Sequence, residues 1–183
     1  MLFYVLAFPD ATAVFKHLGY SFDIEKFKKN YEYYIKRTSH GSSLSKVVHC
    51  FLAHKLGFYN DAWDLFIEVL ESDFYDIQGG TTPEGIHIGV MGGSISIVRR
   101  AFAGVEFLKD RIRIRPRLPK SWHKIRFKFL YNGRWVFLSA TKTQVTIFVY
   151  GLDGQFFDVG VEINNKVHHL LLGKTYKFPL KNP

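Results

Sequence analysis

Two short segments combine hydroxyls, glycine and histidine at positions where helices are expected to begin. The first, residues 38–45, reads Thr-Ser-His-Gly-Ser-Ser-Leu-Ser and contains His40, Gly41, Ser42 and Ser43. Backbone N–H groups at the start of a helix lack partners within the helix, and the helix dipole is positive there. Serine hydroxyls at the same place add further donors. The segment therefore has the composition of an anion-binding site.

The second segment, residues 78–87, leads through a glycine-rich turn into another helix start. It contains Gly80, Thr81, Thr82 and His87. Thr82 followed by Pro83 and Glu84 is a helix start signal, which places His87 one turn inside the helix, facing back toward its beginning. If the two helix beginnings meet in space, they form a cradle of phosphate size. The alternative is that Ser39 or Ser42 and Thr82 are only caps, and that His87 is a hydrogen-bonded core residue.

Other chemistry is poorly supported by the spacing. A Ser42 or Ser43 nucleophile with His40 has no orienting carboxylate nearby and no strand-turn-helix setting. His49 and His54 do not share a helix face, and adjacent histidines at 168–169 in a strand point to opposite sides, so no metal site is expected. Cys50 lies in an amphipathic helical pattern and is interpreted as a core residue.

The composition indicates a folded protein in a reducing compartment. The chain has 183 residues, 47% hydrophobic and 22% charged, with 18 Phe, 10 Tyr and 3 Trp. A single cysteine cannot form an internal disulfide, which favours the cytoplasm. The apolar start, residues 1–8, is too short to span a membrane and is interpreted as core. Because it begins without a polar lead-in, we expect the chain to be a fragment that lacks a packing partner.

Charge is concentrated in the C-terminal part. Residues 1–104 carry a net charge of −1, and residues 105–183 carry +10. In the second part, basic and apolar residues alternate at 111–117 and 124–129, which predicts strands with one basic face. A solvated outer sheet face is the favoured interpretation. A surface for nucleic acid or another polyanion is the alternative and ranks last.

The hydrophobic period changes from helical to strand-like near Gly104. Helices are predicted at 10–18, 23–36, 43–56, 60–72 and 82–102. Strands are predicted at 105–108, 111–115, 124–131, 134–140, 143–150, 158–164, 167–172 and 175–179, with hairpin turns at Asn132-Gly133, Asn164-Asn165 and Gly173-Lys174. The glycines within 85–93 would weaken an isolated helix, so we expect another backbone to approach there.

Residues 33–45 and 76–89 resemble glycoside hydrolase family 65, which includes maltose, trehalose and kojibiose phosphorylases. The resemblance continues through residues 92–93, 99–104 and 116–119. It implies an α+β chain made of the last helices of an (α/α)6 barrel, residues 1–104, followed by a small antiparallel C-terminal β-sandwich, residues 105–183. The family's general acid, a glutamate of an earlier barrel segment, has no counterpart in this chain.

The resemblance also implies roles for particular residues. Phosphate would be bound by Ser42, Ser43 and His87, with His40, Gly41, Gly80, Thr81 and Thr82 as pocket wall. Hydrolytic members carry a base glutamate near the first of these turns, whereas this chain has no Asp or Glu between Tyr33 and Asn60, which favours a phosphorylase. Many of the family's phosphorylases carry Asp where this chain has Gly41, which leaves the sugar specificity open.

The sequence thus predicts part of an enzyme of carbohydrate metabolism that cleaves α-linked glucosyl disaccharides by inverting phosphorolysis. Expected ligands are the disaccharide and inorganic phosphate as co-substrate, with no cofactor, no metal, no membrane and no nucleic acid. The expected partner is the missing upstream barrel segment, and a homodimer is left open. The alternatives are a noncatalytic remnant or scaffold fragment of such an enzyme, and a hydrolytic family member.

Overall fold

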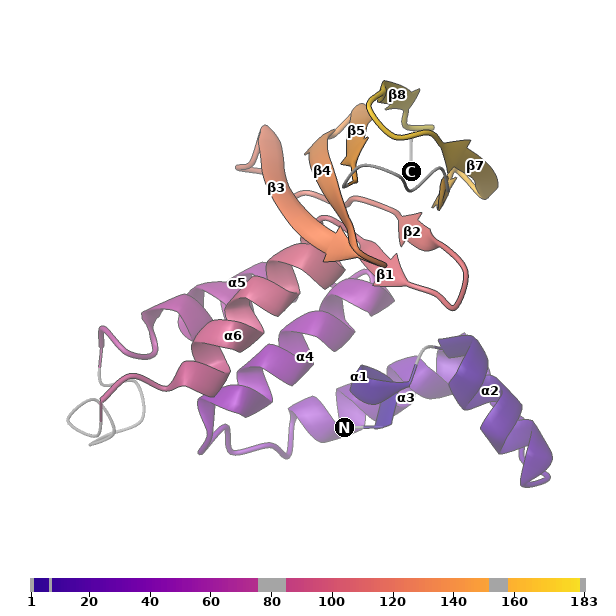
Figure 1. The fold of residues 1–183 in the computed structure, drawn as a ribbon. Helices are drawn as coiled ribbons and strands as arrows, with labels where there is room; N and C mark the ends of the chain where they lie inside the picture. The colour runs from indigo at the N-terminus through magenta and orange to yellow at the C-terminus, as the bar shows by residue number, and fades with distance from the viewer. Residues whose placement is uncertain (1, 7, 76–84, 152–157, 182–183) are drawn as a thin grey trace. The chain divides into compact units, whose positions relative to one another are not determined.

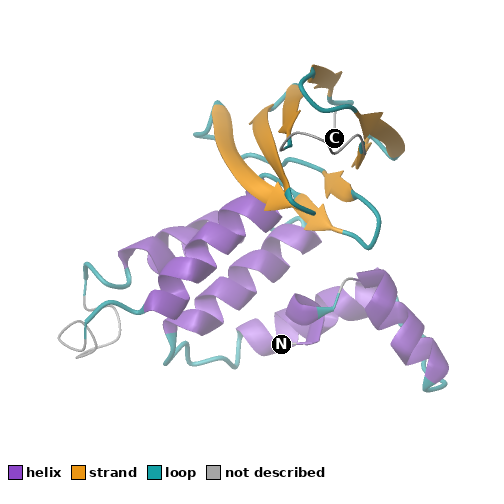
Figure 2. Ribbon diagram, in the orientation of Figure 1, coloured by secondary structure: helices purple, strands orange, loops and turns teal. Residues whose placement is uncertain are grey.

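The computed structural model describes residues 2–6, 8–75, 85–151 and 158–181. The chain divides into two compact units, Met1–Ile97 and Val98–Pro183. The first unit is helical and the second consists mainly of strands (Figure 1; Figure 2).

The helical unit contains six helices among its described residues. They are α1 (Leu2–Val5), α2 (Phe8–His17), α3 (Ile24–Ile35), α4 (Ser43–Leu56), α5 (Tyr59–Glu71) and α6 (Ile88–Ile97). The predictions for the second to fourth helical segments are confirmed within one or two residues. Asp23 caps α3 by accepting a hydrogen bond from the Lys26 backbone N–H, and Gly57 ends α4 in the left-handed conformation (φ 86°).

Helix α4 is the central element of this unit. It packs against both α5 and α6, which lie beside it in Figure 1. Burial on more than one side explains why Lys46 and the run 47–54 are all buried, rather than the single stripe that the sequence predicts. The Lys46 ammonium is accommodated by an ion pair with Glu68 of α5 (Nζ–Oε2 2.9 Å).

The apolar start of the chain is less buried than predicted. Phe3 stacks among other aromatic rings, including Phe22 and Phe27 at centroid distances of 5.0 and 4.6 Å. Leu2 and Val5, however, are 46% and 70% exposed, so the interpretation of this segment as core is wrong for the described residues.

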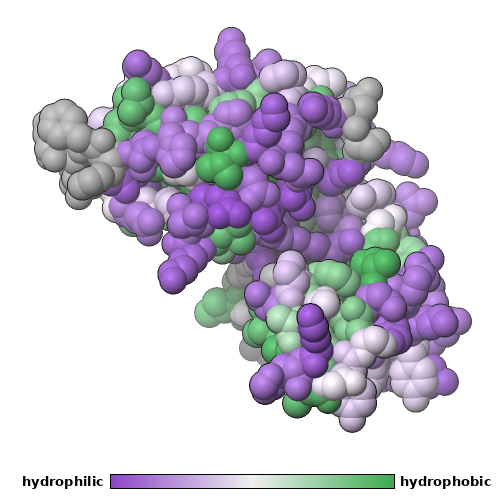
Figure 3. Space-filling view, turned by 90° about the vertical axis from the view of Figure 1, so that its right-hand side faces the viewer, coloured by the Kyte–Doolittle hydropathy of each residue, from purple (hydrophilic) through white to green (hydrophobic). Residues whose placement is uncertain are grey.

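Figure 3 shows one face of the molecule, on which separate hydrophobic patches interrupt a mainly hydrophilic surface.

The fifth predicted helix is wrong at its start. Residues 85–87 are not helical and α6 begins at Ile88, later than the predicted Thr82, which lies outside the described residues. The helix changes to a π-helical turn at Val98–Phe102, which belongs to the second unit. Gly85 stands at φ 99°, a backbone conformation that is incompatible with a right-handed helix.

The described residues of the second unit form two four-stranded sheets. One has the order β1 (Val105–Phe107), β2 (Ile112–Ile114), β6 (Val159–Ile163), β7 (Lys166–Leu170), and the other β3 (Lys124–Tyr131), β4 (Arg134–Thr141), β5 (Gln144–Tyr150), β8 (Thr175–Pro179). All pairs are antiparallel except β2 with β6, which is parallel, so the predicted fully antiparallel domain is corrected. Alternation along single strands does not reveal how distant strands pair.

The inner faces of the two sheets contribute to one buried cluster. Its members are Ala103, Val105, Ile112, Ile114, Ile125, Val136, Leu138, Ala140, Val145, Ile147, Val149, Val159, Val161, Ile163 and Leu170. The Asn132-Gly133 hairpin is confirmed, with both residues at positive φ. Gly173-Lys174 does not form a hairpin, because β8 pairs with β5 rather than with β7.

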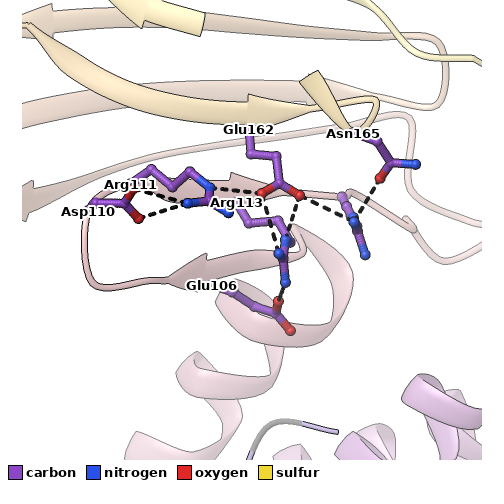
Figure 4. A network of polar contacts seen from close by, with 7 residues as sticks. Glu106, Asp110, Arg111, Arg113, Glu162 and Asn165 are labelled. Carbon is purple, nitrogen blue, oxygen red and sulfur yellow. Dashed lines mark hydrogen bonds and ion pairs between the residues drawn. The ribbon is translucent and has the colours of Figure 1, made fainter. Parts of the chain in front are cut away.

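A single carboxylate binds three of the arginines that the sequence assigns to a basic face. Glu162 of β6 accepts hydrogen bonds from Arg111 Nε (2.9 Å), Arg113 Nε (2.7 Å) and Arg115 Nη2 (3.3 Å). Asp110, Glu106 and Asn165 accept further hydrogen bonds from Arg111, Arg113 and Arg115 respectively (Figure 4). The arginine cations lower the pKa of Glu162 to about 2. Much of the positive charge on this sheet is therefore balanced within the protein.

Candidate anion-binding site

The hydroxyl groups at the start of α4 are not used by the helix. Ser42 precedes the helix with an extended backbone (φ −129°, ψ 131°), and its side chain makes no capping hydrogen bond. Ser43 is the first helical residue and is 5% exposed. Within the described part of the chain, neither hydroxyl has a hydrogen-bond partner. Two hydroxyls and the N–H groups of Ser43 and Leu44 are therefore available as donors at one place, whereas the Ser45 N–H donates to the Ser42 carbonyl oxygen (3.0 Å).

His40 shapes the loop before α4. The Ser45 hydroxyl donates to the Ser42 carbonyl oxygen (2.7 Å), so it must accept from His40 Nδ1 (2.8 Å). His49 Nδ1 donates to the Ser45 carbonyl oxygen (2.8 Å), and the two imidazole rings lie 5.2 Å apart between centroids. Burial, reinforced by His49 and Lys46, lowers the pKa of His40. The His40 ring is therefore neutral at pH 7, and its Nδ1 proton holds the turn.

Helices α4 and α6 run side by side in the same direction. A Cβ atom at Gly89 would lie 3.6 Å from Leu44 Cδ2, and one at Gly93 would lie 2.8 Å from Val47 Cγ2. The expected approach of another backbone to the glycines is not found: side chains of α4 contact Gly89 and Gly93, and a Cβ atom at Gly85 or Gly92 would meet nothing within 4 Å. The residue numbers at the contact thus increase along both helices in the same direction, which makes the helices parallel. Both helices begin at the left-hand end in Figure 1. The beginnings of α4 and α6 consequently lie at the same end of the helical unit.

Gly93→Ala is expected to destabilise the helical unit by about 1–2 kcal/mol, because the added methyl would overlap the stiff Val47 side chain. Gly92→Ala is the matched control, since a Cβ there meets nothing within 4 Å. The free energy of unfolding of the control should rise by up to about 1 kcal/mol, because alanine favours the helix more than glycine does. Urea unfolding followed by circular dichroism measures both, and equal effects of the two substitutions would contradict the close packing of α4 on α6.

His87 stands immediately before α6, not one turn inside a helix as the sequence analysis predicts. Its carbonyl oxygen accepts hydrogen bonds from the N–H groups of Val90 (2.8 Å) and Met91 (3.1 Å). Its side chain is 32% exposed, so the alternative of a buried core histidine does not hold either. His87 therefore marks the beginning of α6, as Ser42 and Ser43 mark the beginning of α4.

Asp73, which follows α5, holds His87 by two hydrogen bonds. Its Oδ1 accepts from His87 Nδ1 (2.7 Å) and its Oδ2 accepts from the His87 backbone N–H (3.0 Å). The hydrogen bond from the imidazole keeps the pKa of Asp73 below its usual value, so the carboxylate is ionised at neutral pH. This arrangement fixes the ring and leaves Nε2 as the nitrogen available to a ligand. Sequence reasoning missed Asp73, because a separation of fourteen residues carries no local pattern.

The remaining predicted wall residues are only partly described. Gly80, Thr81 and Thr82 lie outside the described residues. Gly41 is exposed, and a Cβ atom there would be 3.6 Å from Ser39 Oγ, so its conformation does not require glycine. The left-handed residue of this loop is His40, at φ 51°.

Metal ligands and reactive thiols are the other groups that could form a site within the described ranges. No group of three or more His, Cys, Asp or Glu side chains is arranged to hold a metal ion there. Cys50 is fully buried, and burial raises the pKa of its thiol to about 12, which confirms the interpretation as a core residue. No described helix combines the length and the hydrophobicity needed to cross a membrane.

Comparison with known proteins identifies the family. The profile of the glycosyl hydrolase family 65 central catalytic domain matches residues 1–96, and that of the family's C-terminal domain matches residues 105–170. The chain belongs to glycosyl hydrolase family 65. The family 65 chain is 42% identical to trehalose 6-phosphate phosphorylase of Lactococcus lactis subsp. lactis over 133 residues. The aligned region makes up 73% of the family 65 chain and 17% of that protein.

Other relatives are also named as phosphorylases. Kojibiose phosphorylase of Thermoanaerobacter brockii is 36% identical over 71% of the family 65 chain and 17% of its own length. Alpha,alpha-trehalose phosphorylase of Geobacillus stearothermophilus is 32% identical over 87% of the chain and 20% of its own length. The chain thus spans a fifth or less of these relatives.

A solved structure shares the fold. It is a protein of the human microbiome that is assigned as a kojibiose phosphorylase. The two structures align with a TM-score of 0.74 and 24% sequence identity over 88% of the family 65 chain and 23% of the other chain.

Proposed function

We propose that this chain supplies the phosphate-binding part of an inverting disaccharide phosphorylase that acts on α-linked glucosyl disaccharides. The observation that carries the proposal is the parallel packing of α4 and α6, with their beginnings at the same end. One beginning carries Ser42 and Ser43, and the other carries His87. Relatives named as trehalose, trehalose 6-phosphate and kojibiose phosphorylases support the reaction class.

Phosphate in such a site accepts hydrogen bonds from both helix beginnings. The N–H groups and serine hydroxyls of α4 bind some of its oxygens, and His87 Nε2 binds another from the side of α6. Both helix dipoles are positive at this end and favour the anion. His40, through Ser45, holds the α4 loop in place, and Asp73 holds His87.

Bound phosphate then acts as the nucleophile. One of its oxygens attacks the anomeric carbon of the glucosyl unit while the glycosidic oxygen departs from the opposite face with a proton. The proton comes from a carboxylic acid in another part of the enzyme, in the remainder of the (α/α)6 barrel. The residues of this chain orient phosphate, and the β-sandwich stabilises the assembly.

The residues near the α4 beginning favour phosphate over water as the acceptor. Hydrolysis with inversion needs a second carboxylate to remove a proton from water. Residues 33–60 contain no Asp or Glu. Asp73 is engaged through both carboxylate oxygens with His87. A phosphate ion needs no such base, because it is already charged.

Calorimetric titration of the chain with inorganic phosphate tests the proposal. Ser42→Ala, Ser43→Ala and His87→Ala are each expected to weaken binding about three- to tenfold, the effect of losing one hydrogen bond to a charged ligand. Ser39→Ala is the matched control, since Ser39 is exposed in the same loop and has no assigned contact with phosphate. Phosphate affinities that are the same for all four variants would refute the assignment.

Asp73→Asn is expected to weaken phosphate binding about tenfold. The amide has one acceptor oxygen, which can serve either the backbone N–H or the ring of His87, but not both. If its NH2 group faces Nδ1, the neutral ring carries its proton on Nε2 and can still donate to phosphate. The expected loss of affinity therefore comes from the missing carboxylate charge, which in the parent protein balances a protonated imidazole whose Nε2 donates to phosphate.

Two measurements separate this positioning role of Asp73 from a general loss of structure. The 15N shifts of the His87 ring should report the change from an Nδ1–H to an Nε2–H tautomer in Asp73→Asn. Asp64→Asn removes an exposed carboxylate from α5 and should change neither the tautomer nor the affinity. An unchanged His87 tautomer together with full phosphate affinity in Asp73→Asn would contradict the role.

A further inference from the structure

The outer face of the β3–β4–β5–β8 sheet arranges its side chains in rows across the strands. The strand register places Arg126, Ser139, Thr146 and Lys177 in one row. The next row contains Lys128, Phe137, Phe148 and Thr175. The first row is thus cationic at both edges with hydroxyls between, and the second has two aromatic rings at its centre.

Seven of these eight residues, all except Lys177, line a depression of about 470 Å³. Phe137 is 42% exposed, and its ring lies 5.8 Å from that of Phe148 at an angle of 54°. Lys128 Nζ lies 4.9 Å above the neighbouring Trp135 ring, which is 40% exposed. The depression therefore combines apolar ring surface with polar donors, on a face that the β-sandwich core does not need.

Within the described residues, the charge of this face is uncompensated, unlike that of the other sheet. Strands β3, β4, β5 and β8 contain no Asp or Glu, and the sequence from 111 to 152 contains none at all. Arg126 and Lys177 are exposed, and within the described part of the chain neither makes an ion pair. On the other sheet, Glu162 binds the arginines of β2 and its flanks. The outer face of β3–β4–β5–β8 is therefore complementary to an anion.

We propose that this depression binds a phosphorylated oligosaccharide, at a site separate from the beginnings of α4 and α6. Phe137 and Phe148 contact the C–H faces of the sugar, which carry partial positive charge and are attracted to the negative face of an aromatic ring. Ser139, Thr146 and Thr175 bind sugar hydroxyls. Arg126 binds the phosphate group, for which its guanidinium offers two parallel donors, and Lys128, two residues along the same face of β3, adds a second positive charge beside it.

The lining favours a sugar phosphate over nucleic acid. Proteins that read single-stranded RNA stack bases on open ring faces and bind the base edges with additional hydrogen-bonding side chains. Here the two central rings are tilted toward each other, and the described lining contains hydroxyls but no Asn, Gln, Asp or Glu. Hydroxyls beside two cations of β3 suit a polyhydroxylated ring that carries a phosphate.

Titration of the chain with maltose 6′-phosphate, by calorimetry and by backbone amide NMR, tests the site. Amide shifts are expected in β3, β4, β5 and β8. Arg126→Gln should weaken the affinity about tenfold and Lys128→Gln several-fold. Lys124→Gln is the matched control, because Lys124 is exposed on the same strand and face but outside the depression. It should change the affinity less than twofold.

Several outcomes would overturn the proposal. They are the absence of binding, equal effects of Arg126→Gln and Lys124→Gln, and inorganic phosphate or a uridine decanucleotide binding this sheet at least as tightly as maltose 6′-phosphate. Shifts restricted to residues 42–45 and 87–90 would also overturn it, while agreeing with the proposed phosphate site. Shifts on the sheet without a response of those helix beginnings to inorganic phosphate would support this site and contradict the proposed function.

Discussion

Replacing Gly104 by alanine is expected to lower the free energy of unfolding of the second unit by about 3–5 kcal/mol. Gly104 connects the π-helical turn to β1 and stands at φ 62°, in the left-handed region. A Cβ atom built there lies 1.9 Å from the carbonyl oxygen of Arg115. That oxygen cannot rotate away like a side chain, because the Gly104 carbonyl and the Arg115 N–H are joined by a hydrogen bond of 3.0 Å.

Gly133→Ala separates the cost of positive φ from the cost of the contact with the Arg115 carbonyl oxygen. Gly133 also has positive φ, 76°, but a Cβ atom there meets nothing within 4 Å. Gly133→Ala should therefore lower the free energy of unfolding only by the cost of holding alanine in the left-handed region, about 1–2 kcal/mol. Urea unfolding followed by tryptophan fluorescence in a Trp63→Phe background leaves Trp122 and Trp135, both in the second unit, as reporters. Similar losses for the two alanine variants would show that the contact with Arg115 does not exist.

Glu162→Gln is expected to destabilise the same unit by about 2–3 kcal/mol at pH 7. The glutamine side chain keeps the shape but removes the charge that faces Arg111, Arg113 and Arg115. The Glu162 side chain is only 9% exposed, so water cannot take the place of the lost charge beside the arginines. The arginines are more exposed, which places the expected loss at the low end of values for breaking a buried ion pair.

The pH dependence of stability provides an independent check on Glu162. Its pKa is lowered from 4.5 to about 2 in the folded protein. The stabilisation is therefore present above pH 4.5 and is lost as the pH falls toward 2. The difference between the parent protein and Glu162→Gln should shrink over this interval. Glu106→Gln, which removes one contact of 3.4 Å, should cost less than about 1 kcal/mol. A difference that stays constant from pH 7 to pH 2 would contradict the role of Glu162.

Local sequence signals account for most of the secondary structure. Gly57 ends α4 where the sequence predicts, and Asn132-Gly133 forms the hairpin, because both conformations depend on the residues themselves. Strand positions follow from alternation, and the structure shows it in β4, where Arg134 and every second residue after it are buried. The start of α6 was mispredicted, because a capping signal at Thr82 competes with Gly85 in a left-handed conformation.

Features that depend on distant residues could not be predicted. The hydrogen bonds between Asp73 and His87 join a segment after α5 to the start of α6. Glu162 meets Arg113 across a parallel pairing between strands 49 residues apart, which no short pattern encodes. The burial of Ser43 likewise depends on the packing of α4. The sequence could name the serines and the histidine of the candidate site, but not the side-by-side arrangement of their helices.

A titration of the 15N-labelled chain with inorganic phosphate, followed by amide NMR, tests the central claim most directly. If the beginnings of α4 and α6 form one anion site, the amide signals of residues 42–45 and 87–90 should shift together, with one common dissociation constant. Shifts at one helix only, two different dissociation constants, or no shift at either helix would contradict a shared phosphate site.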